Sequence, residues 1–209
     1  MGATVSEYGR RAVHASGVGL PLLYLLGLST WAQLRYLMIA VTVVVFLLEF
    51  LRLVVGLDHW IYDELTREYE QNGVAGYAFY MSSMTAVALL FGPTVTIPAI
   101  LMLALGDPIS GALGRNGPHE HKRPAVVAVM FGVCFLFAAP FTIAWAGVAA
   151  GAAAAAGGAF LGAVADGIKP IIRGIAVDDN LTIPPAAAVG IAGVFWLLGV
   201  ETGFDPFGL

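Results

Sequence analysis

The sequence predicts an all-α integral membrane protein of about seven transmembrane helices, which form a single domain over residues 1–209. Three observations predict this class. Of the 209 residues, 59% are hydrophobic and only 11% are charged, whereas soluble domains carry about 25% charged residues. Mean hydropathy is +0.84. Apolar runs of membrane-spanning length recur along the chain, and basic residues gather between alternate runs.

The predicted helices follow one another with short connections. Because a spanning helix needs about 20 mostly apolar residues, window hydropathy places seven candidates at 12–28, 36–56, 74–92, 94–105, 125–141, 144–165 and 183–200. The fourth is short, and only Gly92 and Pro93 separate it from the third, so it is expected as a half-helix or a tilted span. The run from Gly147 to Ala165 is almost entirely alanine and glycine, which lets membrane helices pack closely.

The distribution of charge predicts that the N-terminus is cytoplasmic. Seven spans then put the cytoplasmic segments at about 1–11, 57–73, 106–124 and 166–182. Arg35 alone of the 10 basic residues lies outside these segments and the cytoplasmic helix ends; the others are Arg10, Arg11, Arg52, Arg67, Arg115, Lys122, Arg123, Lys169 and Arg173. Twelve of the 14 acidic residues share that side, the exceptions being Glu201 and Asp205. Function is therefore expected on the cytoplasmic face, and the net charge of −4 gives no indication of nucleic-acid binding.

The first polar cluster is Gly106-Asp107-Pro108-Ile109-Ser110-Gly111-Ala112-Leu113-Gly114-Arg115. Asp107 is a good N-cap and Pro108 suits a first turn, so a short helix is expected to begin here at the membrane surface. Its N-terminus would attract phosphate, or Asp107 would hold Mg²⁺ that bridges phosphates. The predicted phosphate contacts are Gly106, Gly111, Gly114 and Arg115. The alternative is a plain capped turn.

The second cluster is Asp178-Asp179-Asn180-Leu181-Thr182-Ile183-Pro184-Pro185. Adjacent carboxylates repel unless a cation is near, so Asp178 and Asp179 are predicted Mg²⁺ ligands and Asn180 a nucleotide contact. Thr182 is expected to cap the next helix, with the two prolines in its first turn. The alternative is a solvated acidic turn.

Two further clusters supply candidates. Asp166 ends the alanine-rich helix, and the basic residues after it, Lys169 and Arg173, are predicted phosphate contacts; the alternative is that they only orient the chain in the membrane. Glu49 and Arg52 are neighbours on one helix face, because they are three residues apart. Ionisable residues at that depth usually face a polar cavity, and the alternative is an internal ion pair that fixes helix packing.

These segments resemble motifs of the dolichol kinase and phytol kinase family. The stretch from Gly106 to Arg115 resembles the family's Gly-Asp-x-x-x-x-x-x-Gly-Arg loop, and Asp178-Asp179-Asn180-Leu181-Thr182-Ile183-Pro184 resembles its Asp-Asp-Asn-Leu-Thr-Ile-Pro signature. Arg10-Arg11-x-x-His14 and Glu49-x-x-Arg52 are also similar, so the resemblance runs from residue 10 to residue 185. It implies a polytopic membrane enzyme that uses a nucleoside triphosphate, typically CTP, to phosphorylate a long isoprenoid alcohol such as dolichol, polyprenol or phytol.

The chain departs from this family after Arg115. It has His121-Lys122-Arg123-Pro124-Ala125 where the family has a Lys-Ser-x-Glu-Gly-type segment, and Asp166 where a glutamate is expected. These differences leave open whether the chain uses CTP or ATP. Two other functions are kept: cytidylyl transfer to a phospholipid precursor, as in the related phosphatidate cytidylyltransferases, and a small transporter.

The resemblance and the residues together give one mechanistic hypothesis. Asp107, Asp178 and Asp179 hold Mg²⁺ and the phosphates of CTP. Arg115, Lys169 and Arg52 neutralise the transferred γ-phosphoryl group, and Asp166 or Glu49 orients or deprotonates the alcohol. The expected location is the plasma membrane of a prokaryote. Small-residue faces of the fourth and sixth helices are candidate homodimer surfaces, and the oligomeric state stays open.

Overall fold

The computed structural model describes residues 3–57, 59, 62, 65–66, 70–114, 121–168, 171–172 and 175–207. These residues are almost entirely helical. Their elements are α1 Ala3–Ser16, α2 Gly19–Leu25, α3 Trp31–Phe50, η1 Leu51–Val55, α5 Gly76–Leu90, α6 Pro93–Leu101, η3 Met102–Gly106, α7 Asp107–Leu113, α8 Pro124–Gly167, β1 Ile171–Ile172, β2 Ile175–Ala176 and α9 Asp179–Leu197. The two η elements are single π-helical turns, and the two short strands pair antiparallel.

Four of these helices are long and apolar enough to cross a membrane. They are Trp31–Val55, Pro93–Leu113, Pro124–Gly167 and Asp179–Leu197, and Gly76–Leu90 is a shorter apolar helix. The predicted all-helical architecture with membrane-spanning segments is therefore confirmed at this level. The count of seven spans and the side on which the N-terminus lies stay predictions.

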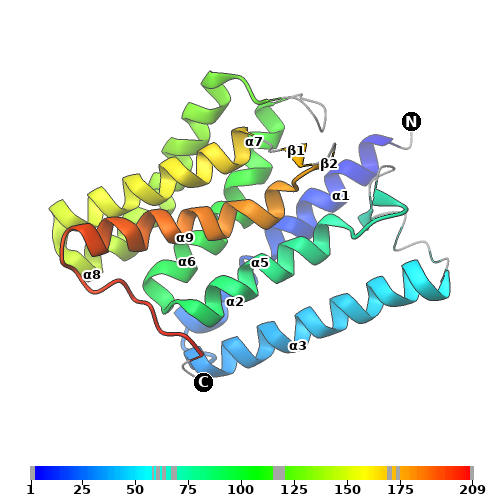
Figure 1. Cartoon of the computed structure of the whole chain (residues 1–209), viewed down its shortest axis with the longest axis horizontal. Coiled ribbons are helices and arrows are strands. Elements are labelled where there is room, and N and C mark those ends of the chain that lie inside the picture. The colour runs from blue at the N-terminus through cyan, green and yellow to red at the C-terminus, as the bar shows by residue number, and fades with distance from the viewer. Residues whose placement is uncertain are drawn as a thin grey trace.

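The 44-residue helix α8 turns back on itself at Gly147, whose φ of 76° and ψ of 172° lie outside the helical range. Glycine alone adopts such a φ readily, because it has no Cβ. Past the turn, a Cβ at Gly151 would overlap the backbone of Ile143, so the two arms pack directly against each other. The arms, seen as a hairpin in Figure 1, correspond to the predicted segments 125–141 and 144–165.

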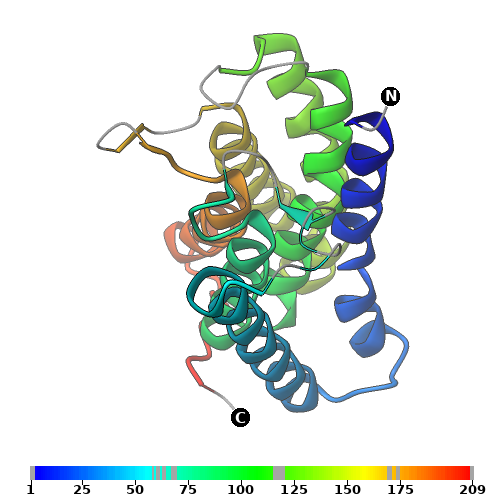
Figure 2. The same ribbon diagram turned by 90° about the vertical axis from the view of Figure 1, so that its right-hand side faces the viewer.

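The first predicted segment, 12–28, is not one helix, because α1 ends at Ser16 and α2 begins at Gly19. Pro21 has no N–H to donate to the carbonyl of Gly17, which accepts instead from the N–H of Leu20 at 3.1 Å. Gly17 also packs against Tyr80 so closely that a Cβ would overlap its hydroxyl oxygen. The two helices lie along one side of the bundle in Figure 2.

Small residues bring the second arm of α8 against α9. A Cβ at Gly158 would overlap the side chain of Ile191, and one at Gly190 would overlap the backbone of Gly157. The glycines of this arm therefore serve helix packing inside the chain, as expected in membranes. Because α9 covers this face of the predicted sixth helix, the face packs within the chain, and the homodimer stays a prediction.

At one end of the bundle, a buried arginine holds the C-terminal tail. Arg35 is fully buried and stacks over Trp31 at 5.5 Å. Its guanidinium donates to the carbonyls of Ala88 at 2.7 Å and Phe91 at 3.3 Å, at the end of α5. It also bonds the carboxylate and the carbonyl of Asp205, at 3.0 and 2.8 Å. The one basic residue predicted outside is thus a structural clamp.

Replacing Arg35 by methionine is expected to lower the free energy of unfolding by about 1.5–3 kcal/mol, the range for hydrogen bonds to a charged group. Thermal unfolding of the purified chain in detergent, followed by circular dichroism, measures this as a lower Tm. Asp205→Asn is the matched control. It removes the negative charge that faces Arg35, but the half-exposed side chain keeps an oxygen that can accept the hydrogen bond. An unchanged Tm in Arg35→Met would contradict the clamp.

Candidate metal and phosphate site

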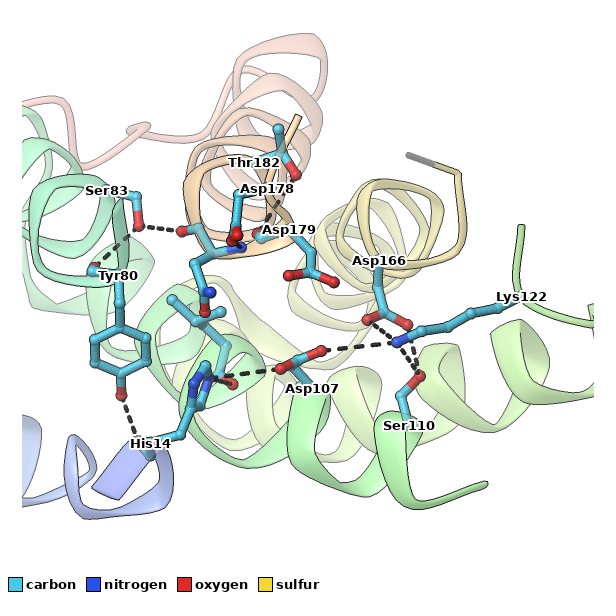
Figure 3. A network of polar contacts seen from close by, with 12 residues as sticks. His14, Tyr80, Ser83, Asp107, Ser110, Lys122, Asp166, Asp178, Asp179 and Thr182 are labelled. Carbon is cyan, nitrogen blue, oxygen red and sulfur yellow. Dashed lines mark hydrogen bonds and ion pairs between the residues drawn. The ribbon is translucent and has the colours of Figure 1, made fainter. Parts of the chain in front are cut away.

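Three carboxylates from three helices meet at the end of the bundle opposite the tail. Asp107 opens α7, Asp166 lies at the end of α8, and Asp179 is the first residue of α9. One oxygen of each lies within 4.8 Å of the other two, and Figure 3 shows the side chains pointing toward one another. Asp166 and Asp179 are buried, and Asp107 is partly exposed. Carboxylate oxygens are the ligands that Mg²⁺ and Ca²⁺ prefer.

The spacing of this carboxylate triad, Asp107 with Asp166 and Asp179, fits a single divalent cation. Oxygens on opposite sides of one ion lie about 4 Å apart around Mg²⁺ and about 5 Å apart around Ca²⁺. The observed limit of 4.8 Å falls in this range, so little side-chain movement is needed. Mg²⁺ usually keeps several waters and binds substrate phosphates as well, which leaves room for a nucleotide.

A buried ammonium group neutralises part of the triad. Lys122, with a side chain only 7% exposed, places Nζ 2.6 Å from Asp166 Oδ1 and 3.7 Å from Asp107 Oδ1. It also donates to Ser110 Oγ at 3.0 Å, and Ser110 in turn donates to Asp166 Oδ2 at 2.6 Å. Such a buried pair is tolerable because extra hydrogen bonds satisfy both partners. One ammonium therefore faces two carboxylates.

Neither Lys122 nor Ser110 was among the predicted site residues. Ser110 follows Asp107 by three residues, so helical spacing alone would have put both on one face. Lys122 stands in the segment that departs from the family pattern, and its role depends on a hydrogen bond from its own N–H to the carbonyl of Gly167, at 3.0 Å. That contact docks the start of α8 beside its end, which sequence spacing does not reveal.

Asp107 is not the predicted N-cap. The backbone stays helical through Gly106 (φ −64°, ψ −49°) and Asp107 (φ −62°, ψ −47°), so α6, η3 and α7 form one continuous helix. The N–H of Asp107 bonds the carbonyl of Met102, five residues back. This wider π turn accommodates Pro108, and π turns of this kind are frequent at functional sites. The predicted phosphate-binding helix N-terminus at Asp107 is therefore wrong.

The three predicted glycine contacts have different surroundings. Gly106 is buried, and a Cβ there would lie 3.0 Å from Cε of Met130, so this residue serves helix packing rather than the predicted phosphate contact. The carbonyl of Gly111 accepts from Arg11 at 3.2 Å. Gly114 ends α7 through its N–H to Ser110, and it lies beside the Lys122 side chain. Gly114 is thus placed beside the Lys122 side chain of the network around the triad.

The Asp178-Asp179 pair divides its roles. Asp178 is the N-cap of α9, because its Oδ1 accepts from the N–H of Asn180 at 2.9 Å. Its carboxylate is not in the triad, whereas that of Asp179 is. Thr182 is therefore not the predicted cap, and Pro184 lies inside the helix rather than in its first turn. Capping by Asp178 starts the helix four residues earlier than the hydropathy pattern indicates.

Asn180, the predicted nucleotide contact, follows Asp179 and is only 6% exposed. Its Oδ1 has no hydrogen-bond donor among the residues that the structure describes. Its Nδ2 lies 3.1 Å from the place a Cβ of Gly76 would take. A buried amide oxygen without a donor costs free energy, so a ligand or water with a hydrogen to donate suits this position.

Glu49 and Arg52 form an internal ion pair, which was the alternative prediction for these two residues. Arg52 donates to both oxygens of Glu49, at 2.9 and 2.8 Å. It also donates to the carbonyl of Gly73 at 2.6 Å, and Glu49 accepts from the N–H of Ala75 at 3.0 Å and from the hydroxyl of Tyr77. Each carboxylate oxygen is thus engaged. The pair ties η1 to the segment before α5, so the predicted base and phosphate contact are corrected to structural roles.

Replacing Glu49 by glutamine is expected to destabilise the fold by about 3–5 kcal/mol, because it leaves the Arg52 guanidinium buried without its counter-charge. Thermal unfolding in detergent measures the loss as a lower Tm. The double variant Glu49→Gln with Arg52→Met should recover part of it. Turnover per folded chain should stay near the wild-type value, and its complete loss in folded protein would return Glu49 to the active site.

The remaining predicted contacts, Arg115, Lys169 and Arg173, lie outside the described residues. Comparison of the chain with models of protein families, with curated proteins and with solved structures found no match. We therefore infer the function from the contacts around the triad.

Proposed function

We propose that this chain is a membrane kinase that transfers the γ-phosphate of CTP, or of another nucleoside triphosphate, to the hydroxyl of a long isoprenoid alcohol. The observation that carries the proposal is the carboxylate triad with Lys122 at one end of apolar helices. A cation-binding acidic group beside a fixed ammonium suits phosphoryl transfer, which depends mainly on positioning and charge neutralisation. The triad residues Asp107, Asp166 and Asp179 would hold Mg²⁺.

The reaction forms a bond between the alcohol oxygen and the γ-phosphorus. It breaks the bond between that phosphorus and the bridging oxygen, which leaves with the electron pair as part of CDP. When bound, Mg²⁺ supplies positive charge that neutralises the phosphate oxygens. The alcohol proton leaves to a carboxylate or to water.

The chain's own residues divide the remaining work. Lys122 holds a positive charge beside Asp107 and Asp166, where charge on the transferred group is neutralised. Of the two predicted bases, Asp166 belongs to the triad and Glu49 does not, so Asp166 is retained as the residue that orients the hydroxyl. The free Oδ1 of Asn180 is suited to accept a hydrogen bond from a substrate hydroxyl or amino group.

The acceptor is proposed to be a lipid alcohol because the site stands at the end of apolar helices. On α3 and η1, large apolar side chains are exposed, including Val43, Phe46 and Val54, as expected for a lipid-facing helix. A long apolar tail would stay in the bilayer while the hydroxyl reaches the triad. The proposal includes seven spans, a cytoplasmic N-terminus and site, and the plasma membrane of a prokaryote as the location.

The test uses purified protein in detergent with Mg²⁺, γ-labelled CTP and a panel of polyprenols, phytol and geranylgeraniol. The proposal expects label in the lipid phase, and the preferred alcohol would name the substrate class. A parallel reaction with γ-labelled ATP decides between the nucleotides. Transfer of label from α-labelled CTP to a phosphatidate-like acceptor would contradict the kinase in favour of cytidylyl transfer, and no transfer from any nucleotide would reject both.

A further inference from the structure

Two prolines each leave a backbone carbonyl without its helical partner, one on each of two helices that carry triad carboxylates. In the π turn η3, the N–H of Asp107 bonds the carbonyl of Met102, five residues back. The same pattern would pair the N–H of residue 108 with the carbonyl of Leu103. Pro108 has no N–H and cannot make this bond. In α9, Pro184 likewise cannot donate to the carbonyl of Asn180, four residues back.

Side chains from other helices satisfy both carbonyls. Nε2 of His14, on α1, lies 3.0 Å from the carbonyl oxygen of Leu103; because a carbonyl only accepts, this nitrogen carries the proton. Ser83, on α5, donates from Oγ to the carbonyl of Asn180 at 2.6 Å. A buried carbonyl without a donor is costly, so each proline creates a specific docking point for a neighbouring helix.

The two contacts are joined to each other. The hydroxyl of Tyr80 donates to the carbonyl of His14 at 2.7 Å, and the two rings contact edge to face with centroids 4.4 Å apart. Ser83 follows Tyr80 by three residues on α5 and therefore lies on the same face. Leu103 is one turn before Asp107, and Asn180 adjoins Asp179. The chain of contacts, drawn in Figure 3, thus links the helix of Asp107 to that of Asp179.

We infer that His14, Tyr80 and Ser83 are positioning residues that set the separation of Asp107 from Asp179, and with it the fit of a divalent cation. The inference rests on the proposed function, since it concerns the cation bound by the same triad. None of the three needs to touch the cation. Ser83 acts on the backbone beside Asp179, and His14 acts on the backbone before Asp107 and lies 3.7 Å from its Oδ2. Tyr80 holds His14 in place through its carbonyl, so all three act as outer-shell partners of metal ligands do.

The probe is Mn²⁺ in place of Mg²⁺, with binding to the full chain in detergent measured by the loss of the free-ion electron paramagnetic resonance signal. Ser83→Ala and His14→Phe are each expected to weaken Mn²⁺ affinity by about tenfold or more, the range for outer-shell substitutions. The phenyl ring of His14→Phe keeps the stacking on Tyr80. It removes the donor to the carbonyl of Leu103 and also the 3.7 Å contact between Nε2 and Asp107 Oδ2.

The decisive comparison restores the missing donor on the helix itself. Pro184→Ala supplies an N–H for the carbonyl of Asn180, so adding it to Ser83→Ala should return most of the lost affinity. Pro108→Ala should return only the part of the loss in His14→Phe that comes from the carbonyl of Leu103, because the contact with Asp107 stays absent. A general packing defect would not be repaired in this way, and the doubly substituted chains also guard against simple misfolding.

The outcomes separate the two proposals. Wild-type protein that binds no Mn²⁺, or binds it equally well with Asp179→Asn, would overturn the proposed function and this inference with it. Binding that depends on Asp179 but is unchanged in Ser83→Ala and His14→Phe would overturn the inference alone. Binding that stays weak in Ser83→Ala after Pro184→Ala is added would overturn it as well.

Discussion

Replacement of Asp179 by asparagine is expected to lower phosphoryl transfer by at least about a hundredfold. Asp179 brings one of the three carboxylate oxygens that lie within 4.8 Å of one another. Asparagine keeps the shape and removes the negative charge, so the cation is lost or displaced. The charge of that cation stabilises the transition state by several kcal/mol. The measurement is label transferred from γ-labelled CTP to lipid, per folded chain, at saturating Mg²⁺.

The adjacent residue supplies the matched control for this prediction. Asp178→Asn removes an equal charge one residue away, but this side chain caps α9 and lies outside the triad. Asparagine is as good an N-cap as aspartate, so transfer should stay close to the wild-type level. Equal losses in the two variants would mean that both carboxylates serve the cation, as the sequence alone predicts.

Replacing Lys122 by glutamine is expected to lower the free energy of unfolding by about 3–5 kcal/mol, because it leaves the fully buried Asp166 without its counter-charge. Transfer per folded chain should fall by about a hundredfold, the cost of removing one preorganised electrostatic contact. Cation affinity should instead rise, since one positive charge beside the triad is gone. Thermal unfolding, labelled-CTP transfer and Mn²⁺ binding measure the three effects separately.

A double variant separates charge from packing at this position. Lys122→Gln with Asp166→Asn removes both charges of the pair, so most of the lost stability should return while transfer stays low. If turnover recovered along with stability, neither Lys122 nor Asp166 would take part in transfer. A fall in cation affinity in Lys122→Gln would contradict the expectation that the Lys122 ammonium opposes cation binding.

The sequence identified all three triad residues but assigned them to different roles. Asp107 and Asp179 were predicted metal ligands, and Asp166 was predicted as a base. Their meeting depends on the hairpin at Gly147, which returns α8 to the end of the bundle where α7 and α9 lie. Residue spacing shows which side chains share one helix face, and it does not show which helix ends are neighbours.

The errors at Asp107 and Thr182 share one physical cause. Capping rules place proline in a first turn because its missing N–H is harmless there. In this chain the helices continue through Pro108 and Pro184, because His14 and Ser83 satisfy the carbonyls that the prolines leave free. Those donors come from helices about 90–100 residues away in sequence, so local rules could not anticipate them.

For Glu49 and Arg52, spacing predicted the pair correctly and left its role open. Their three-residue separation predicts contact, and both the cavity and the ion-pair interpretations are compatible with it. The decision comes from Gly73, Ala75 and Tyr77, which take the remaining hydrogen-bonding positions of the pair. An ion pair within a membrane helix therefore indicates a packing contact first, and a catalytic role needs further evidence.

The most direct test of the central claim, that Asp107, Asp166 and Asp179 hold one divalent cation, is the stoichiometry of Mn²⁺ binding to the wild-type chain and to Asp107→Asn. We expect one Mn²⁺ ion per wild-type chain, which Mg²⁺ displaces. The ion should be lost in Asp107→Asn and retained in Asp178→Asn. Wild-type binding that survives in Asp107→Asn, or the absence of a bound ion in folded wild-type protein, would contradict this claim.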